Sequence, residues 1–239
     1  MEHNFRNKHG ELLDTSYFAA ERDDALILIG HGVTGNKDRP VVKNTADYLT
    51  KAGFPCLTFS FSGNGESEGR FEDSTISKEV EDLSALVDQL QGPRKLVYIG
   101  HSMGGAVGVL FGARDERLTA LVTLAGMVET KDFYDREFSD VTPNEGFMWD
   151  EEDCPLSQKF KDDLYQIGST LKAAEQLRTP YLILHGTADD IVLPGDSEAV
   201  KERVGKIGTL RMFDGLSHSF TESPEAAPKA IVDFLKDVL

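Results

Sequence analysis

Short apolar runs alternate with amphipathic stretches along most of the chain. Runs such as residues 25–29 are continuously apolar, which is typical of strands buried on both faces of a parallel sheet. The stretches between them place apolar residues along one face of a helix. We expect strands at 25–29, 55–61, 96–99, 118–125, 181–184 and 209–213, and helices at 41–52, 77–90, 104–111, 169–177, 196–204 and 226–239. This alternation predicts an α/β fold with a mostly parallel central sheet and helices on both of its faces.

Two segments depart from the alternation. Residues 4–7 and 12–18 flank a turn at 9–10 and predict an N-terminal antiparallel hairpin. Residues 127–168 mix aromatic and acidic side chains with proline and are too long for an ordinary connection. We expect this segment to form a lid inserted into one domain that spans residues 1–239, because active-site covers commonly arise from long insertions. The alternative is a peripheral segment that only packs on the sheet.

The net charge of the chain limits the classes of partner that we expect it to bind. The formal net charge is -16, from 25 basic and 41 acidic side chains, so we expect neither nucleic acid nor anionic membrane surfaces to bind. No stretch is as long and apolar as a membrane span, and the first residues lack the apolar region of a signal peptide. Two cysteines do not make a disulfide framework. We therefore expect a cytoplasmic protein, and the sequence leaves a homo-oligomer open.

Residues 100–104 read Gly-His-Ser-Met-Gly and offer the strongest chemical signal. They follow a predicted strand and open a small apolar helix, which is the context of a G-x-S-x-G nucleophile elbow. The sharp turn of an elbow holds serine in a strained backbone conformation, so its neighbours must lack bulky side chains. The pattern predicts Ser102 as a nucleophile.

A serine at its ordinary pKa is a weak nucleophile and needs a histidine to take its proton. His218 is the favoured base because it follows the last predicted strand and is flanked by small residues. For the other histidines we expect a solvated position near the start of the chain or a structural role beside glycine at strand ends (His3, His9, His31, His101 and His185).

The histidine in turn needs a carboxylate that orients it. Asp189 and Asp190 follow the strand at 181–184, and as neighbours only one of them should face His218. The spacing from Gly186 favours Asp189, whereas a capping role before the next helix suits Asp190 and Asp196 better. Since ligands of open parallel sheets bind beyond the carboxyl ends of the strands, Ser102, Asp189 and His218 should meet at that edge.

Acyl transfer also creates an oxyanion, which is best stabilised by backbone N–H groups. Met103 directly follows the nucleophile, and Val33 lies in a loop that Gly32 allows to approach it. We expect these two residues to form the oxyanion hole. The sequence has no metal-ligand motif, and its glycine-rich turn at 63–69 is not followed by the lysine of a phosphate-binding loop. We therefore expect no metal and no cofactor.

Five segments of the chain, in this order, resemble motifs of the α/β-hydrolase superfamily: residues 31–37, 59–67, 100–105, 185–192 and 215–220. They are similar to those of bacterial cinnamoyl (feruloyl) esterases and of the serine aminopeptidase and monoacylglycerol-lipase-like group. The resemblance implies the α/β-hydrolase fold and supports Asp189 as the acid. Val33 stands where those esterases often have phenylalanine, and Ser60 where an aspartate is usual.

These expectations combine into a serine carboxylic-ester hydrolase that acts on a small-molecule ester through a Ser-His-Asp triad and an acyl-enzyme. A cinnamoyl-ester substrate is the finer expectation, which the resemblance implies. The alternatives on the same triad are a thioesterase, an acyltransferase, an amidase and a monoacylglycerol lipase. A ligand-binding protein without turnover is the alternative from another class of protein.

Overall fold

The structure is a computed structural model that describes residues 4–91 and 94–239, so His3 lies outside the described residues. Within them a seven-stranded sheet has the order β1-β3-β2-β4-β5-β6-β7. β1 is antiparallel to β3, and every other neighbouring pair is parallel, which confirms the predicted mostly parallel sheet. The strands are β1 (Thr15–Phe18), β2 (Ala25–Gly30), β3 (Cys56–Phe59), β4 (Lys95–His101), β5 (Leu118–Leu124), β6 (Tyr181–Gly186) and β7 (Gly208–Phe213).

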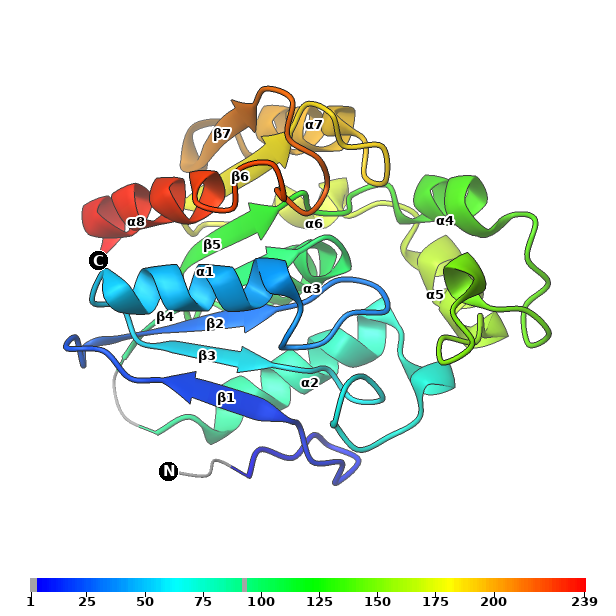
Figure 1. Ribbon diagram of the computed structural model, residues 1–239. Coiled ribbons are helices and arrows are strands. Elements are labelled where there is room, and N and C mark those ends of the chain that lie inside the picture. Colours follow the sequence, from blue (N-terminus) through cyan, green and yellow to red (C-terminus); the bar gives the residue numbers. More distant parts are fainter. Residues whose placement is uncertain (1–3, 92–93) are drawn as a thin grey trace.

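Helices cover both faces of the sheet (Figure 1). α1 (Pro40–Lys51) and α8 (Ala226–Val238) pack on one face, where their apolar side chains share a core with those of the strands. The other face carries a second core together with α2 (Ile76–Gln89), α3 (Met103–Gly112), α6 (Leu171–Ala174) and α7 (Pro194–Val204). Two short 3-10 turns, η1 (Phe71–Asp73) and η3 (Gly205–Ile207), complete these layers.

The carboxyl ends of the parallel strands lie at one edge of the sheet (Figure 1). β2 and β6 are buried along their whole length, as the continuous apolar runs predict. Each of these strands ends in a loop at that edge, and so do β4 and β7. The topology therefore brings together loops that are far apart in the sequence.

The N-terminal hairpin is shorter than expected. It is closed by a single β-bridge between Arg6 and Leu12, with Gly10 in the turn at a φ of 80°. The strand that follows covers only Thr15–Phe18 of the expected 12–18, because it pairs with the four residues of β3. β1 is thus an antiparallel strand at the edge of the sheet, beside β3.

Residues 127–168 form α4 (Thr130–Phe138), the 3-10 turn η2 (Met148–Asp150) and α5 (Gln158–Ile167). α4 and α5 lie beyond the carboxyl edge of the sheet (Figure 1). Their aromatic rings pack on one another, with Phe138 in contact with Tyr134, Trp149 and Phe160. The segment is thus a small aromatic-centred unit beside the loops that follow the strands.

The expected helix at 169–177 is reduced to Leu171–Ala174. At its start the N–H of Thr170 donates to the carbonyl of Val128. At its end the N–H groups of Gln176 and Leu177 donate to carbonyls only three residues earlier, which tightens the last turn. The chain therefore returns to the sheet through tight turns instead of a full helix.

Candidate active site

Ser102 lies at a sharp turn between β4 and α3. Its φ of 53° and ψ of -121° are strained for a residue with a side chain. A Cβ on Gly100 would lie 2.1 Å from the carbonyl oxygen of Gly104, and a Cβ on Gly104 would lie 2.5 Å from that of His31. Glycine is thus required at both positions, and the turn has the form expected of a nucleophile elbow.

Asp189 and His218 form a hydrogen bond at the same edge of the sheet. The Nδ1 of His218 lies 2.8 Å from Asp189 Oδ2, and both residues are buried. Asp189 Oδ1 accepts hydrogen bonds from the N–H groups of Ile191 and Val192, at 3.0 Å each. Asp190 is exposed, so the choice between the two neighbouring aspartates falls on Asp189 by geometry as well as by spacing.

His185, near the end of β6, contacts the same carboxylate. Its Nε2 lies 3.0 Å from Asp189 Oδ2 and 2.9 Å from the carbonyl oxygen of Val192. Because both partners only accept, this nitrogen carries a proton. The other ring nitrogen lies 2.7 Å from the hydroxyl of Ser197. The sequence indicated a structural role for His185 but not that its partner is Asp189, the predicted acid.

Asp189 is therefore a fully buried carboxylate with N–H donors on both oxygens. Burial alone would raise its pKa, but the hydrogen bonds from His185 and His218 outweigh burial and hold the pKa well below its ordinary value. The carboxylate stays ionised over the whole physiological pH range. It can orient His218 and stabilise a positive charge on that ring.

The loop after β2 places Val33 beside the nucleophile. A Cβ on Gly32 would lie 2.7 Å from Ser102 Cβ, so the glycine permits this close approach. His31 anchors the loop, because its Nε2 accepts the N–H of Phe61 at 3.0 Å and its Nδ1 donates to the carbonyl of Gly32 at 2.9 Å. Burial lowers the pKa of His31 to about 4, so the ring is neutral at neutral pH.

The predicted oxyanion donors lie on elements that leave N–H groups available. Met103 is the first residue of α3, and the first N–H groups of a helix have no intrahelical acceptor. Ser60, which stands where an aspartate is usual in the resembling esterases, accepts the N–H of Lys37 at 3.1 Å. Ser60 thus ties the loop that carries Val33 to the end of β3.

His101 lies beside the nucleophile and holds the loop of the predicted base. Its Nε2 donates to the backbone carbonyl of His218 at 3.1 Å, and the two ring centroids are 4.7 Å apart. Burial, together with the neighbouring His218, lowers the pKa of His101 to about 3. The ring is therefore neutral, and its role is structural, as expected from the sequence.

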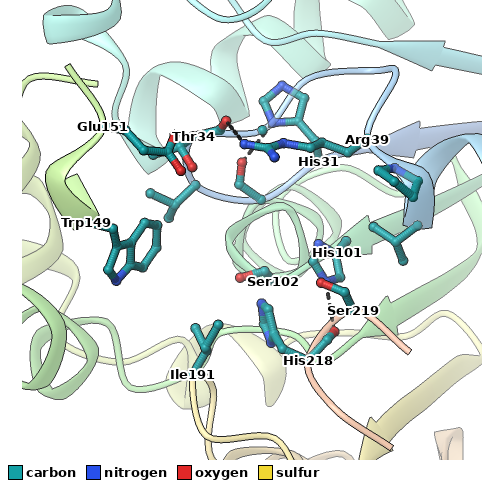
Figure 2. A pocket seen from close by; sticks show the side chains of 15 residues that line it. His31, Thr34, Arg39, His101, Ser102, Trp149, Glu151, Ile191, His218 and Ser219 are labelled. Carbon is teal, nitrogen blue, oxygen red and sulfur yellow. Dashed lines mark hydrogen bonds between the residues drawn. The ribbon is translucent and has the colours of Figure 1, made fainter. Parts of the chain in front are cut away.

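A cavity of about 340 Å³ opens above Ser102 and His218 (Figure 2). Val33, Pro40, Val41 and Ile191 give it apolar walls. Residues that the sequence did not single out also line it, namely Arg39, Trp149 and Glu151. The latter two come from residues 127–168, and no local pattern distinguishes them from the other aromatic and acidic side chains of that segment.

Residues 4–91 and 94–239 provide neither a metal site nor a membrane-spanning helix. No three His, Cys, Asp or Glu side chains in these ranges are arranged to hold a metal ion. In the same ranges no helix combines the length and apolarity that crossing a membrane requires. Cys56 and Cys154 are both buried and unpaired.

The fold and the strained serine turn define this protein as an α/β-hydrolase. Residues 21–144 and 156–225 match the family of serine aminopeptidases, S33. The chain belongs to that family, which confirms the resemblance stated from the sequence.

Relatives in the family carry several descriptions. The mitochondrial palmitoyl-protein thioesterase ABHD10 of Bos taurus is 30% identical over 176 residues, which cover 66% of this chain and 55% of the relative. The uncharacterized protein YfhR of Salmonella typhimurium is 27% identical over 206 residues, which cover 80% of this chain and 63% of the relative. The matched region thus spans little more than half of each of these curated relatives.

Solved structures share the fold. Est1E from Butyrivibrio proteoclasticus with bound ferulic acid has a TM-score of 0.85 at 23% identity, covering 96% of both chains. The monoacylglycerol lipase of Paleococcus ferrophilus has a TM-score of 0.76 at 21% identity, covering 95% of this chain and 99% of the other. At these identities the likeness concerns the fold alone.

Proposed function

We propose that this protein is a serine hydrolase of carboxylic esters in which Ser102 is the nucleophile, His218 the base and Asp189 the acid. The observation that carries the proposal is the hydrogen bond between His218 and the buried Asp189, at the edge of a cavity that Ser102 also lines. A strained serine beside an oriented imidazole is the arrangement that nucleophilic acyl transfer requires.

The reaction would proceed in two halves. Ser102 Oγ attacks the ester carbonyl and its proton passes to His218 Nε2, while Asp189 stabilises the charged ring. The N–H groups of Val33 and Met103 donate to the oxyanion. Collapse breaks the bond to the alcohol, which leaves with the proton from His218. A water molecule then attacks the acyl-enzyme by the same route and releases the acid.

Residues 127–168 would act as the lid of this site and complete a single domain. The support is that Trp149 and Glu151 line the cavity beside the nucleophile. Trp149 and Asp150 also adopt positive φ angles of 49° and 61°, which bulky residues rarely do. A segment that holds strained residues against a cavity is more than a peripheral excursion.

A thioesterase is the second candidate, because a relative at 30% identity is described as a palmitoyl-protein thioesterase. A cinnamoyl ester remains the finer proposal for the substrate, and it has the support of the fold shared with the ferulic-acid complex of Est1E. A thioesterase and a cinnamoyl esterase differ in the leaving atom, which is sulfur in the first and oxygen in the second, and in the acyl group.

The test is hydrolysis of p-nitrophenyl esters of increasing acyl length, methyl ferulate and an acyl thioester series, each with Ser102→Ala beside the wild type. We expect Ser102→Ala to lower kcat/KM by roughly 10⁴-fold or more. Preference for methyl ferulate would support the cinnamoyl substrate, and preference for thioesters would favour the second candidate. Turnover that Ser102→Ala retains would refute the nucleophile, and binding without turnover would indicate a ligand-binding protein.

A further inference from the structure

A second cavity adjoins the active-site cavity. It has a volume of about 210 Å³ and lies between the first turns of α1, the loop after His218 and the start of α8. Both cavities are lined by Pro40, Val41 and Ser219. The second one adds Asn44, Thr45, Phe220, Thr221, Pro224, Ala227 and Pro228.

The active-site cavity reaches both sides of the nucleophile, and the second cavity adjoins it on one of them. Trp149 and Ile191 lie on one side of Ser102, and Ser219, which also lines the second cavity, lies on the other (Figure 2). Ser219 and Phe220 directly follow His218 in the chain. The second cavity is therefore next to the group that passes its proton to the departing alcohol.

The backbone at this point is strained as well. Phe220 has a φ of 56° although its side chain is bulky and buried, and its ring packs against Phe213 with a centroid distance of 6.0 Å. Strained residues of this kind persist where the surrounding structure holds them, and they concentrate at functional sites. The strain fixes a part of the second cavity's lining that directly follows Ser219, a residue that both cavities share.

The lining of the second cavity has a distinct chemistry. None of its residues is ionisable, although 28% of the whole chain is charged. Three prolines make part of the wall rigid, and the hydroxyl of Thr45 donates to the carbonyl of Val41 at 2.7 Å. Such a wall favours an uncharged, largely apolar group and offers no cation for a phosphate or a carboxylate.

We propose that the second cavity is the leaving-group subsite, and that it takes an uncharged alcohol portion of several carbon atoms. The inference rests on the proposed ester hydrolysis. The acyl group then occupies the opposite side of the cleft, beside Trp149 and Ile191. Because hydrolysis runs through an acyl-enzyme, the same subsite also receives an added alcohol that competes with water.

The test places a phenylalanine at exposed positions on the rim of the subsite, so that the added ring fills it. Asn44→Phe and Thr221→Phe each add a ring at an exposed position on a different wall. Lys43→Phe is the matched control, because Lys43 is an exposed neighbour on α1 that lines neither of these two cavities. Acetate esters of methanol, 1-butanol and benzyl alcohol vary the alcohol, and methyl esters of acetate, butyrate and hexanoate vary the acyl group.

We expect both filling variants to lower the ratio of kcat/KM for benzyl acetate over methyl acetate by at least about tenfold. The ratios within the acyl series should stay within about twofold, a difference of less than 0.5 kcal/mol. Transfer of the acyl group to added 1-butanol, relative to hydrolysis, should fall in parallel. Lys43→Phe should leave all ratios as in the wild type.

The assignment would be overturned if the two filling variants changed the selectivity along the acyl series instead. It would also be overturned if neither filling variant changed the selectivity along the alcohol series. The proposed function fails in a different way, namely when wild-type turnover of these esters is absent or survives in Ser102→Ala. Two variants on different walls keep the test decisive when one of them does not fold.

Discussion

The contact between His185 and Asp189 leads to a prediction about activity and about stability at acid pH. His185→Leu removes an N–H donor that lies 3.0 Å from Asp189 Oδ2 and keeps a side chain of similar bulk. A hydrogen bond to a charged group contributes about 1.5–3 kcal/mol. If the bond serves fully to hold Asp189 for the reaction, its loss corresponds to roughly a 10- to 150-fold lower kcat/KM.

The pH profile separates this role from a purely structural one. Hydrogen bonds from His185 and His218 keep the pKa of Asp189 low against the effect of burial, so losing one donor moves that pKa upward. An aspartate with a depressed pKa stabilises the folded protein above its unfolded pKa, and this stability is lost as the pH falls through the folded pKa. In His185→Leu Asp189 should therefore contribute less stability, and the loss of that contribution should be complete at a higher pH than in the wild type.

The assays are kcat/KM at about pH 7 and the unfolding free energy in urea between about pH 2 and pH 7, with the folded fraction determined by circular dichroism. His185→Gln should restore much of the activity because its amide can donate from a similar position. Ser197→Ala, which removes the partner of the other ring nitrogen, should have a smaller effect. A wild-type profile in folded His185→Leu would mean that the N–H groups of Ile191 and Val192 hold Asp189 by themselves.

Two further substitutions test other parts of the structure. Gly32→Ala places a Cβ 2.7 Å from Ser102 Cβ and should displace an oxyanion donor, so kcat falls by about 100-fold; an unchanged kcat with a correctly folded variant would contradict the role of this loop. Glu79 is buried with one unpartnered oxygen, and burial and the nearby Asp82 raise its pKa well above the ordinary value. A raised carboxyl pKa makes the stability of the wild type fall as the pH rises above about 4.5. In urea titrations, the unfolding free energy of Glu79→Gln relative to the wild type should therefore increase with pH. The same pH dependence of stability in both proteins would refute this.

The sequence was sufficient to predict those features that local residue patterns determine. Continuous apolar runs located the buried strands, and the strand-turn-helix context located Ser102. The rule that parallel strands end at one edge then brought the loops of Asp189 and His218 together without any contact information. Five motifs in the expected order were sufficient to identify the family.

Other features depend on partners that local pattern does not encode. β1 is four residues long because β3 offers four partners, although Leu13 before it is more deeply buried than the residues of β1. Asp196 was expected to cap the helix that follows it, but α7 has no side-chain cap. Its carboxylate instead accepts the N–H groups of Val128 and Glu129, at 3.1 and 3.3 Å. A carboxylate at the start of a helix predicts that it accepts N–H groups, but not from which segment.

Three histidines at or directly after strand ends, each beside a glycine, hold three different loops of the site. His31 donates to the carbonyl of Gly32, His101 to that of His218, and His185 to that of Val192. Each of the loops that carry the proposed oxyanion donor Val33, the proposed base and the proposed acid is thus held by a buried ring.

The charge state of these rings matters for the reaction. Burial lowers the pKa of His31 to about 4 and that of His101 to about 3, so both rings hold their loops without a charge. A positive His101, with its ring centroid 4.7 Å from that of His218, would oppose the positive charge on His218 that the proposed ester cleavage requires. The same burial that fixes the loop of His218 therefore also suits the role of base that we propose for His218.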